Sequence, residues 1–266
     1  MSFSDVEAVS NGDPQPHPDF YQNVVVMRHG DRLDNFDRSW VATAARPFDP
    51  PLYKDGLVRA SDTGRTFRNL LGFPIHRVFV SPFIRCVQTA AQVVSALSSA
   101  APDASSAVNP SPLIKVSIEY GLCEMLTNVA IKPDLAPKDE NWDFSIPQLE
   151  AIFPTGIVNV DRSIERVYKE MPPWEGSAEV TRTRYVQLFH TLADKYPSEN
   201  LLLVTHGEGV GVAVSEFKEN TTVYGVEYCA FVELRRPVFQ RGYSFVFGKF
   251  EAILREEQGG IKFIEE

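Results

Sequence analysis

Two histidines, three arginines and one glutamate follow four short apolar runs of the sequence. They lie in Arg-His-Gly-Asp-Arg at 28–32, Ser-Pro-Phe-Ile-Arg at 81–85, Gly-Leu-Cys-Glu at 121–124 and Thr-His-Gly at 205–207. A phosphoryl group in transfer needs a nucleophile, cations on its oxygens and a proton for the leaving oxygen. Since this set offers all three, it predicts phosphoryl transfer.

His29 is the expected nucleophile, because a neutral imidazole can attack phosphorus through a ring nitrogen. Nearby guanidinium groups should lower its pKa by repulsion and so keep it neutral. Arg28, Arg32 and Arg85 are the expected phosphate ligands, since their forked donors match phosphate oxygens better than lysine does. Gly30 should let the turn approach the ligand closely.

Glu124 is the expected proton donor and His206 a second group on the phosphate. Glu124 stands beside Cys123 and Met125, and this apolar setting is expected to raise its pKa enough to protonate a leaving oxygen. It could then act as the base for the attacking water. His206 is expected to donate a hydrogen bond to a phosphate oxygen as charge builds.

The elements that position these residues alternate along the chain. Apolar runs at 24–27, 78–80, 116–118 and 201–204 predict strands buried on both faces, while apolar residues recur every three or four positions in 57–71, 87–97 and 180–196. Ser177 could cap the last helix. Alternation at 228–234 and 243–250 predicts one or two further strands at a sheet edge. This order predicts an α/β fold with three layers, α/β/α, around a mainly parallel sheet. Ligands bind such sheets beyond the carboxyl ends of the strands.

We expect one domain over residues 20–266, preceded by a loose polar tail over 1–19. Residues 98–112 should form a surface loop. The stretches 33–53 and 127–176 fit neither period and carry prolines with bulky aromatic residues. Their composition favours an irregular cover for the core over a substrate-selecting lid, although loops of this length are often functional.

Composition narrows the expected partners and compartment. The formal charge of −9 disfavours nucleic acid, and no apolar run approaches the roughly 18 residues that a membrane span needs. Three widely spaced cysteines and the lack of an N-terminal signal favour the reducing cytoplasm. The expected partner is a phosphoester, small or peptidic. No metal or other cofactor is expected, because a dinuclear metallophosphatase needs clustered Asp, Asn and His, whereas arginine is not a metal ligand.

The spacing of one cysteine and one arginine could wrongly suggest a cysteine-dependent phosphatase. Cys229 and Arg235 are separated as in cysteine-dependent phosphatases, whose thiolate lies in a phosphate-binding loop at a helix N-terminus. The intervening residues 230–234 contain no glycine and predict a strand. The spacing is therefore interpreted as coincidence.

Three features together resemble a known family. They are Arg-His-Gly at 28–30, Ser-Pro at 81–82 with Arg85 and Gln-Thr-Ala at 88–90, and Thr-His-Gly at 205–207. Over roughly residues 20–235 the chain thus resembles branch 1 of the histidine phosphatase superfamily, which includes the phosphoglycerate mutases. Within it, Arg32, the run 85–90 and Gly-Leu-Cys-Glu at 121–124 most resemble the TULA (Sts) type phosphatase domains and related plant proteins.

The resemblance implies the phosphoglycerate mutase-like fold and a reaction without metal. It implies that His29 is phosphorylated, that Glu124 donates the proton, and that the phosphate site comprises Arg28, Arg32, Arg85 and His206. Asp31 and Glu208 differ from the residues usual in that family at these positions, and these differences concern which leaving group the enzyme prefers.

The preferred function is hydrolysis of a phosphomonoester through a phosphohistidine. A mutase of the phosphoglycerate type is the nearest alternative, but nothing after Glu124 resembles the basic cluster that would hold its sugar acid. A noncatalytic phosphate-binding or scaffold domain is the alternative of another class, and the complete set of six residues speaks against it.

Overall fold

The computed structural model describes residues 17–98, 113–139, 141–255 and 259–265. Most of the expected tail and nearly all of the expected loop at 98–112 therefore lie outside the described residues. The expected strands and helices are present, most of them longer than their sequence signals. They are β1 (Phe20–Arg28), β2 (Arg77–Val80), β3 (Ile114–Ile118) and β5 (Leu201–Thr205), with helices α2 (Lys54–Leu70), α3 (Ile84–Ser98) and α5 (Ala178–Lys195).

The main sheet has the order β4-β3-β2-β5-β1-β7-β8, where β4 is Val158–Val160, β7 is Phe231–Arg241 and β8 is Ser244–Phe247. Pairing is parallel from β4 to β1, whereas β7 runs antiparallel to β1. Strand β9 (Glu251–Ile253) also pairs with β7. The alternation near the end of the chain thus corresponds to three strands at one edge.

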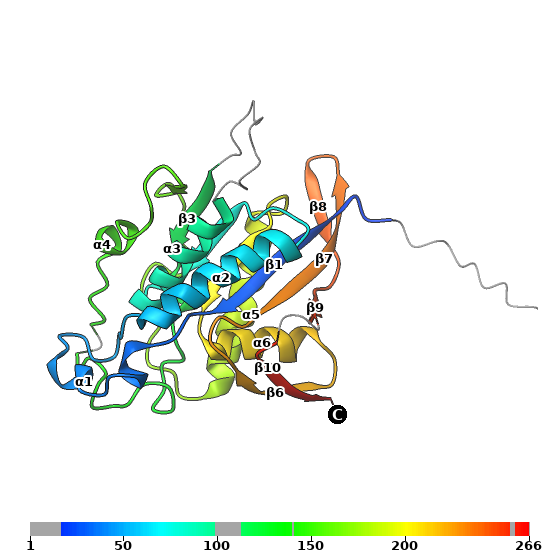
Figure 1. Cartoon of the computed structure of the whole chain (residues 1–266). Coiled ribbons are helices and arrows are strands. Elements are labelled where there is room, and N and C mark those ends of the chain that lie inside the picture. The colour runs from blue at the N-terminus through cyan, green and yellow to red at the C-terminus, as the bar shows by residue number, and fades with distance from the viewer. Residues whose placement is uncertain (1–16, 99–112, 140, 256–258, 266) are drawn as a thin grey trace, which may run out of the picture.

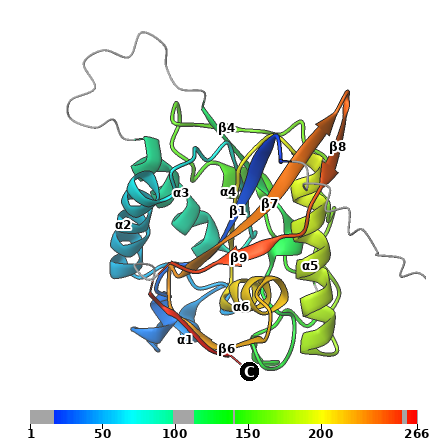
Figure 2. The same ribbon diagram turned by 90° about the vertical axis from the view of Figure 1, so that its right-hand side faces the viewer.

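Helices cover both faces of this sheet. Figure 2 shows α2 and α3 on one side of the strands and α5 on the other. Neighbouring β1 residues point to opposite faces: Val25 and Met27 join the core under α2 and α3, whereas Val24 and Val26 join the core under α5. Since both faces are buried, the strands need apolar residues at every position. The three-layer arrangement with a mainly parallel sheet is confirmed.

Several elements carried no clear sequence signal. Helix α6 (Gly207–Phe217) follows β5 directly, and it packs beside a two-stranded sheet of β6 (Thr221–Val226) and β10 (Ile261–Glu265), as Figure 1 shows. The sequence of α6 contains three glycines, which lower helix propensity, so its helical form depends on packing. No helix among the described ranges is long and apolar enough to cross a bilayer.

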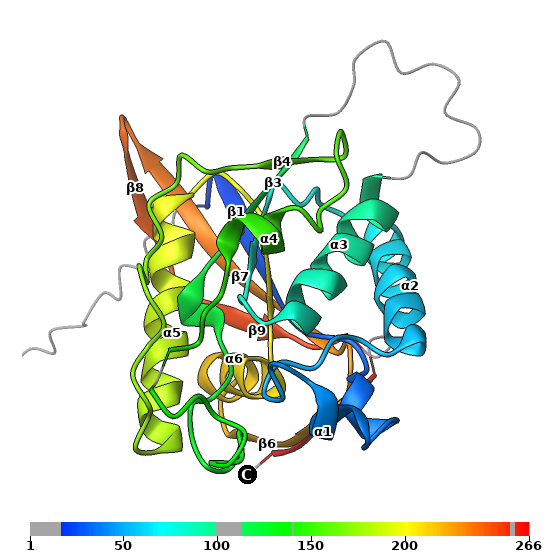
Figure 3. The same ribbon diagram turned by 90° about the vertical axis from the view of Figure 1, so that its left-hand side faces the viewer.

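The two irregular stretches pack on each other. They contain short helices, namely η1 (Leu33–Asn35) and α1 (Trp40–Thr43) in the first and α4 (Ile146–Glu150) in the second (Figure 3). The rings of Phe48 and Trp142 lie 5.1 Å apart, and Arg46 donates to the carbonyl of Asp143. Trp142 and Phe153 belong to the buried core. The stretches therefore cover the core, as the composition favours.

Candidate active site

His29 and His206 lie side by side because the register of two parallel strands places them there. Arg28 at the end of β1 pairs with Thr205 at the end of β5, so the next residues of both strands meet at the same edge. The two rings are 5.3 Å apart between centroids. Both residues are buried. The expected meeting of strand ends is thus present in the fold.

The tautomer of His29 follows from its neighbours. Its Nδ1 lies 2.8 Å from the carbonyl oxygen of Gly30, which can only accept, so Nδ1 carries the hydrogen. Its Nε2 accepts a hydrogen bond of 3.2 Å from Nε of Arg85. Burial, reinforced by the charge of Arg85, holds the pKa of His29 well below its usual range. The ring is therefore neutral near pH 7, with a lone pair on Nε2.

Arg85 contacts the other ionisable side chains of the cluster. Its Nη2 lies 3.3 Å from Oε2 of Glu124 and 3.3 Å from Nδ1 of His206, and its Nη1 lies 3.8 Å from Oδ1 of Asp49. The side chain is 1% exposed. A buried guanidinium needs such partners, because an unpaired charge in the interior is costly. Arg85 therefore holds the cluster together.

Both ring nitrogens of His206 have partners. Nδ1 lies 3.1 Å from Oε2 of Glu124, and Nε2 lies 2.9 Å from the hydroxyl of Ser81. Burial lowers the pKa of His206 to about 4, although the carboxylate of Glu124 acts in the opposite direction. The imidazole is thus neutral near pH 7. It can donate one hydrogen bond and accept another.

Glu124 lies in the cluster, but its ionisation differs from the sequence expectation. Burial alone would raise its pKa, yet the hydrogen bond with His206, whose ring becomes charged at the low pH where the carboxyl titrates, and the charge of Arg85 outweigh burial and hold the pKa well below its usual range. The expected rise in the pKa is therefore wrong. The local sequence shows the apolar neighbours Cys123 and Met125, whereas Arg85 and His206 come from distant segments.

Arg28 lies at the rim of the cluster, half buried. Its Nη1 donates to the carbonyl of Val226, and its guanidinium lies over the ring of Tyr228, 4.3 Å from the centroid. The same ring is 5.7 Å from that of His29. Tyr228 thus joins the arginine to the histidine, and the sequence analysis did not single it out.

Arg32, unlike Arg28 and Arg85, forms an ion pair with a carboxylate close by in the sequence. Its Nε and Nη2 donate to both carboxylate oxygens of Asp34, at 3.0 and 2.6 Å. The side chain of Arg32 is 26% exposed. Burial would lower the pKa of Arg32, but the hydrogen bond and the charge of Asp34 outweigh burial and raise it, and Glu124 acts in the same direction.

Two buried donors in this cluster have no hydrogen-bond partner among the described residues. They are Nε of Arg28 and Nη1 of Arg85. Buried polar groups are almost always hydrogen-bonded, so unpaired donors of two arginines indicate a place for an anion. The N-termini of α3 and α6 lie at the same edge, directly before Arg85 and after His206, and they also favour negative charge.

Three groups that could ligate a metal ion also lie here. Ligand atoms of His29, Glu124 and His206 are all within 4.8 Å of one another. Arg85 contacts each of them through a nitrogen that donates, and this guanidinium would face a metal cation at short range. The residues therefore do not fit a metal ion, and they suit an anion.

Asp49 and the hydroxyl of Ser81 also contact the site, although neither was predicted to do so. Asp49 accepts a hydrogen bond of 2.8 Å from the backbone of Ile84 and lies beside Arg85; burial raises its pKa. It belongs to the stretch 33–53, and nothing in its local sequence distinguishes it. Ser81 follows β2 at the same edge as the other site residues, and that position was a usable signal.

Two further residues considered in the sequence, Glu208 and Cys229, are buried or partly buried in the fold. Glu208 is in the first turn of α6, where burial, with the charge of Glu124, raises its pKa. Cys229 is buried, and burial raises its pKa to about 12; strand β7 begins two residues later. No phosphate-binding loop separates it from Arg235, as expected.

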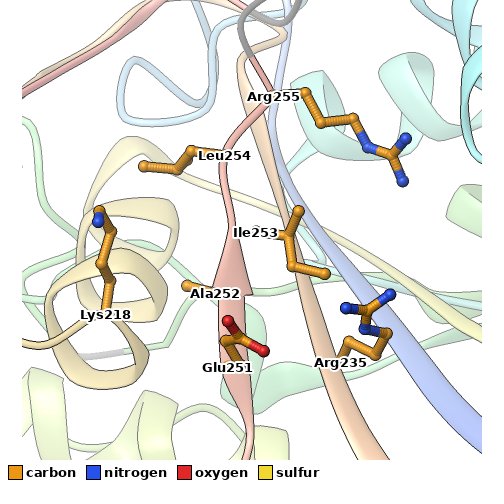
Figure 4. Close-up of a pocket in the computed structure, with 7 residues that line it drawn as sticks. All are labelled: Lys218, Arg235, Glu251, Ala252, Ile253, Leu254 and Arg255. Carbon is orange, nitrogen blue, oxygen red and sulfur yellow. The ribbon is translucent and has the colours of Figure 1, made fainter.

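A shallow groove lies on another part of the molecule, along β9 (Figure 4). Lys218, Arg235 and Arg255 line it with Glu251. Lys218 pairs with Glu265 at 2.9 Å, and Arg255 pairs with Glu233 at 2.6 Å. These pairs already use much of the positive charge of the groove, and we assign no function to it.

Comparisons with known proteins agree with the fold. The family model of the histidine phosphatase superfamily (branch 1) matches residues 24–150. No curated protein matches the chain. Among solved structures, the ecdysone phosphate phosphatase of Bombix mori is similar over 86% of this chain and 92% of its own, with 21% identity and a TM-score of 0.56. The phosphoglycerate mutase of Bacillus anthracis str. Sterne covers the same shares, with 16% identity and a TM-score of 0.50. Residues 24–150 therefore resemble branch 1 of the histidine phosphatase superfamily, and the chain has a phosphoglycerate mutase-like α/β fold.

Proposed function

We propose that the protein is a metal-independent phosphomonoester hydrolase that forms a phosphohistidine on Nε2 of His29. In the first step the Nε2–P bond forms while the bond from phosphorus to the leaving oxygen breaks, and Glu124 gives that oxygen a proton. In the second step the Glu124 carboxylate removes a proton from water. The new O–P bond then replaces the Nε2–P bond, and inorganic phosphate leaves.

One observation carries this proposal: Nε2 of His29 bears a lone pair and lies 3.2 Å from Nε of a buried arginine. A nucleophile is useful only in its neutral form, and the lowered pKa of His29 supplies that form near pH 7. The unpaired donors of Arg28 and Arg85 could bind the equatorial oxygens of phosphate.

The ionised state of Glu124 in the free enzyme requires a source for the donated proton. A phosphomonoester that binds as its monoanion brings one proton with it. Its negative charge also offsets the charge of Arg85, which helps to lower the pKa of Glu124, so the proton can pass to this carboxylate. Glu124 then delivers it to the leaving oxygen.

The substrate is proposed only as a class, a phosphoester that is either small or peptidic. A panel that ranges from phosphotyrosine peptides to sugar phosphates and steroid phosphates would rank substrates by kcat/KM. From the sequence features alone, we also propose that the protein is related to the TULA (Sts) type phosphatase domains and that it is located in the cytoplasm.

The test is turnover of p-nitrophenyl phosphate in excess EDTA by the wild type and by His29→Ala, with trapping of acid-labile phosphate on the protein. The variant should lose about 10³-fold or more in rate and trap no phosphate. His190→Ala, on α5, is the matched control and should retain both. Comparable rates for wild type and His29→Ala would refute the mechanism.

The same measurements separate the alternatives. A mutase would hold its phosphohistidine against water and transfer it to a phosphoglycerate. A noncatalytic domain would bind inorganic phosphate without turnover or trapped phosphate.

A further inference from the structure

We propose that Arg184 is a positioning residue that fixes the backbone from which the proton donor Glu124 projects. This inference rests on the proposed function of Glu124. Arg184 lies on α5, outside the cluster of site residues, and its side chain is 4% exposed. Its guanidinium is directed at the loop that carries Glu124 and not at the phosphate site.

The contacts of Arg184 concentrate on backbone oxygens of this loop. Nη1 donates to the carbonyls of Gly121 and Cys123, the latter at 3.2 Å, and Nη2 donates to the carbonyl of Glu124 at 3.2 Å. A rigid fork with several donors can bind carbonyls in different directions at once, which lysine cannot do. One side chain thus holds three carbonyls of the loop.

Two neighbouring side chains add to these contacts, one of them on the remaining carbonyl. The hydroxyl of Tyr185 donates to the carbonyl of Cys123 at 2.6 Å, and the hydroxyl of Thr205 donates to the carbonyl of Leu122 at 2.7 Å. All four carbonyls from residue 121 to residue 124 therefore accept hydrogen bonds from side chains of α5 and β5. Residues Tyr120–Leu122 form the 3-10 helix η2, which backbone hydrogen bonds from Leu122 to Glu119 and from Cys123 to Tyr120 close. The side chains of α5 and β5 fix the carbonyl side of this turn and of the two residues after it.

Glu175 extends this support beyond Glu124. It binds Nε of Arg184 at 2.7 Å and accepts hydrogen bonds from the backbone of Leu126 at 2.9 Å and from Thr181 at 2.6 Å. Its own backbone N–H donates to the carbonyl of Leu126 at 2.7 Å. The chain is thus bound on both sides of Glu124, before and after the acid.

The consequence concerns proton transfer more than phosphate binding. A proton donor must lie within hydrogen-bond reach of the leaving oxygen, and a displacement of about 1 Å can cost on the order of 10²-fold in rate. Arg28 and Arg85 do not depend on this loop for their backbone positions, since they lie on β1 and α3. Loss of Arg184 should therefore slow proton transfer to the leaving oxygen and leave the inhibition constant of inorganic phosphate nearly unchanged.

The test compares two leaving groups in the full chain. p-Nitrophenolate departs without a proton, whereas an alkoxide needs one. We expect Arg184→Lys and Arg184→Met to lower kcat/KM for phenethyl phosphate about 10- to 100-fold and kcat/KM for p-nitrophenyl phosphate less than about 3-fold. The comparison uses kcat/KM because it reports the first step alone, whereas kcat also includes the second step, in which Glu124 acts as base for both substrates. Tyr185→Phe removes a single hydrogen bond to the loop and should show the same selectivity, more weakly, if the arginine variants do not fold. Arg182→Ala, an exposed residue of α5 paired with Glu216, is the matched control and should change neither rate.

Glu124→Gln is the reference for the selectivity. If it shows the selective loss and the folded Arg184 and Tyr185 variants do not, the positioning proposal is wrong while the proposed function stands. An equal loss for both substrates in the Arg184 variants also contradicts it, because that pattern indicates a general structural defect. If Glu124→Gln itself is unselective, the acid assignment fails and the positioning proposal fails with it.

Discussion

Nδ1 of His29 donates to the carbonyl of Gly30, the next residue, at 2.8 Å, whereas Nδ1 of His76 accepts from the backbone N–H of Asn200 at 2.8 Å. The two histidines are therefore held in opposite tautomers. ¹⁵N NMR of the imidazoles at pH 7 should show a protonated Nδ1 for His29 and a protonated Nε2 for His76. Signals assigned with His29→Asn and His76→Asn decide the matter, and a protonated Nε2 at His29 would contradict the proposed nucleophile.

Arg85 should be hard to replace even by lysine. Arg85→Lys keeps the charge but loses the fork that contacts His29, Glu124 and His206 together, so kcat/KM should fall about 10²-fold. Arg85→Ala should lose more. Arg65→Ala, an exposed arginine of α2, serves as control in the same assay and should retain wild-type kcat/KM. Full activity of Arg85→Lys would show that charge alone suffices.

Gly30 should not tolerate a side chain. A Cβ there would lie 2.7 Å from the carbonyl oxygen of Gly56, a backbone atom that cannot move away easily. Gly30→Ala should lower the free energy of unfolding by about 1–3 kcal/mol and reduce activity. Gly211→Ala, in α6, meets only ordinary contacts at 3.8 Å and should stabilise by about 0.5–1 kcal/mol. Urea denaturation measures both, and a neutral Gly30→Ala would disprove the close approach.

Arg32 and Asp34 can be separated by kinetics. If Arg32 leaves Asp34 to bind substrate phosphate, Arg32→Ala should raise KM about 10-fold, and Asp34→Ala should leave KM equal or lower. If the pair serves only as a surface ion pair, neither variant changes KM, and each lowers stability by less than about 1 kcal/mol. Steady-state kinetics with p-nitrophenyl phosphate distinguishes the two outcomes.

Buried neutral histidines should make the fold sensitive to acid. His206 has a pKa of about 4 in the folded protein and about 6.5 when unfolded, so between these values the unfolded chain binds the proton and the folded chain does not. Its contribution is complete above pH about 6.5 and is lost as the pH falls towards 4, at about 1.4 kcal/mol per pH unit. The free energy of unfolding of His206→Gln, measured at pH 7, 6 and 5, should decline less steeply by that amount. Equal slopes would contradict the lowered pKa.

The local pattern of apolar residues was sufficient to predict the parallel strands and the helices between them. Continuous apolar runs such as 24–27 and 201–204 can only be buried on both faces, and helical spacing in 180–196 sets one face of α5 against the sheet. The carboxyl ends of the parallel strands then lie at one edge of the sheet, which is why the sequence alone predicts that His29, Arg85 and His206 lie together. Helix α6 was not predicted, because its glycines lower the helix propensity of the sequence and its helical form depends on packing.

Other properties depend on residues that are far apart in the chain. The pKa of Glu124 follows from Arg85 and His206, and its backbone position follows from Arg184 on α5; no local pattern around residue 124 contains these partners. Residue types and strand ends thus decided which chemical groups meet and at which edge. Their protonation states, tautomers and supports came only from the folded arrangement, because electrostatic energies and hydrogen bonds depend on distances of a few ångströms in space and not on separation along the sequence.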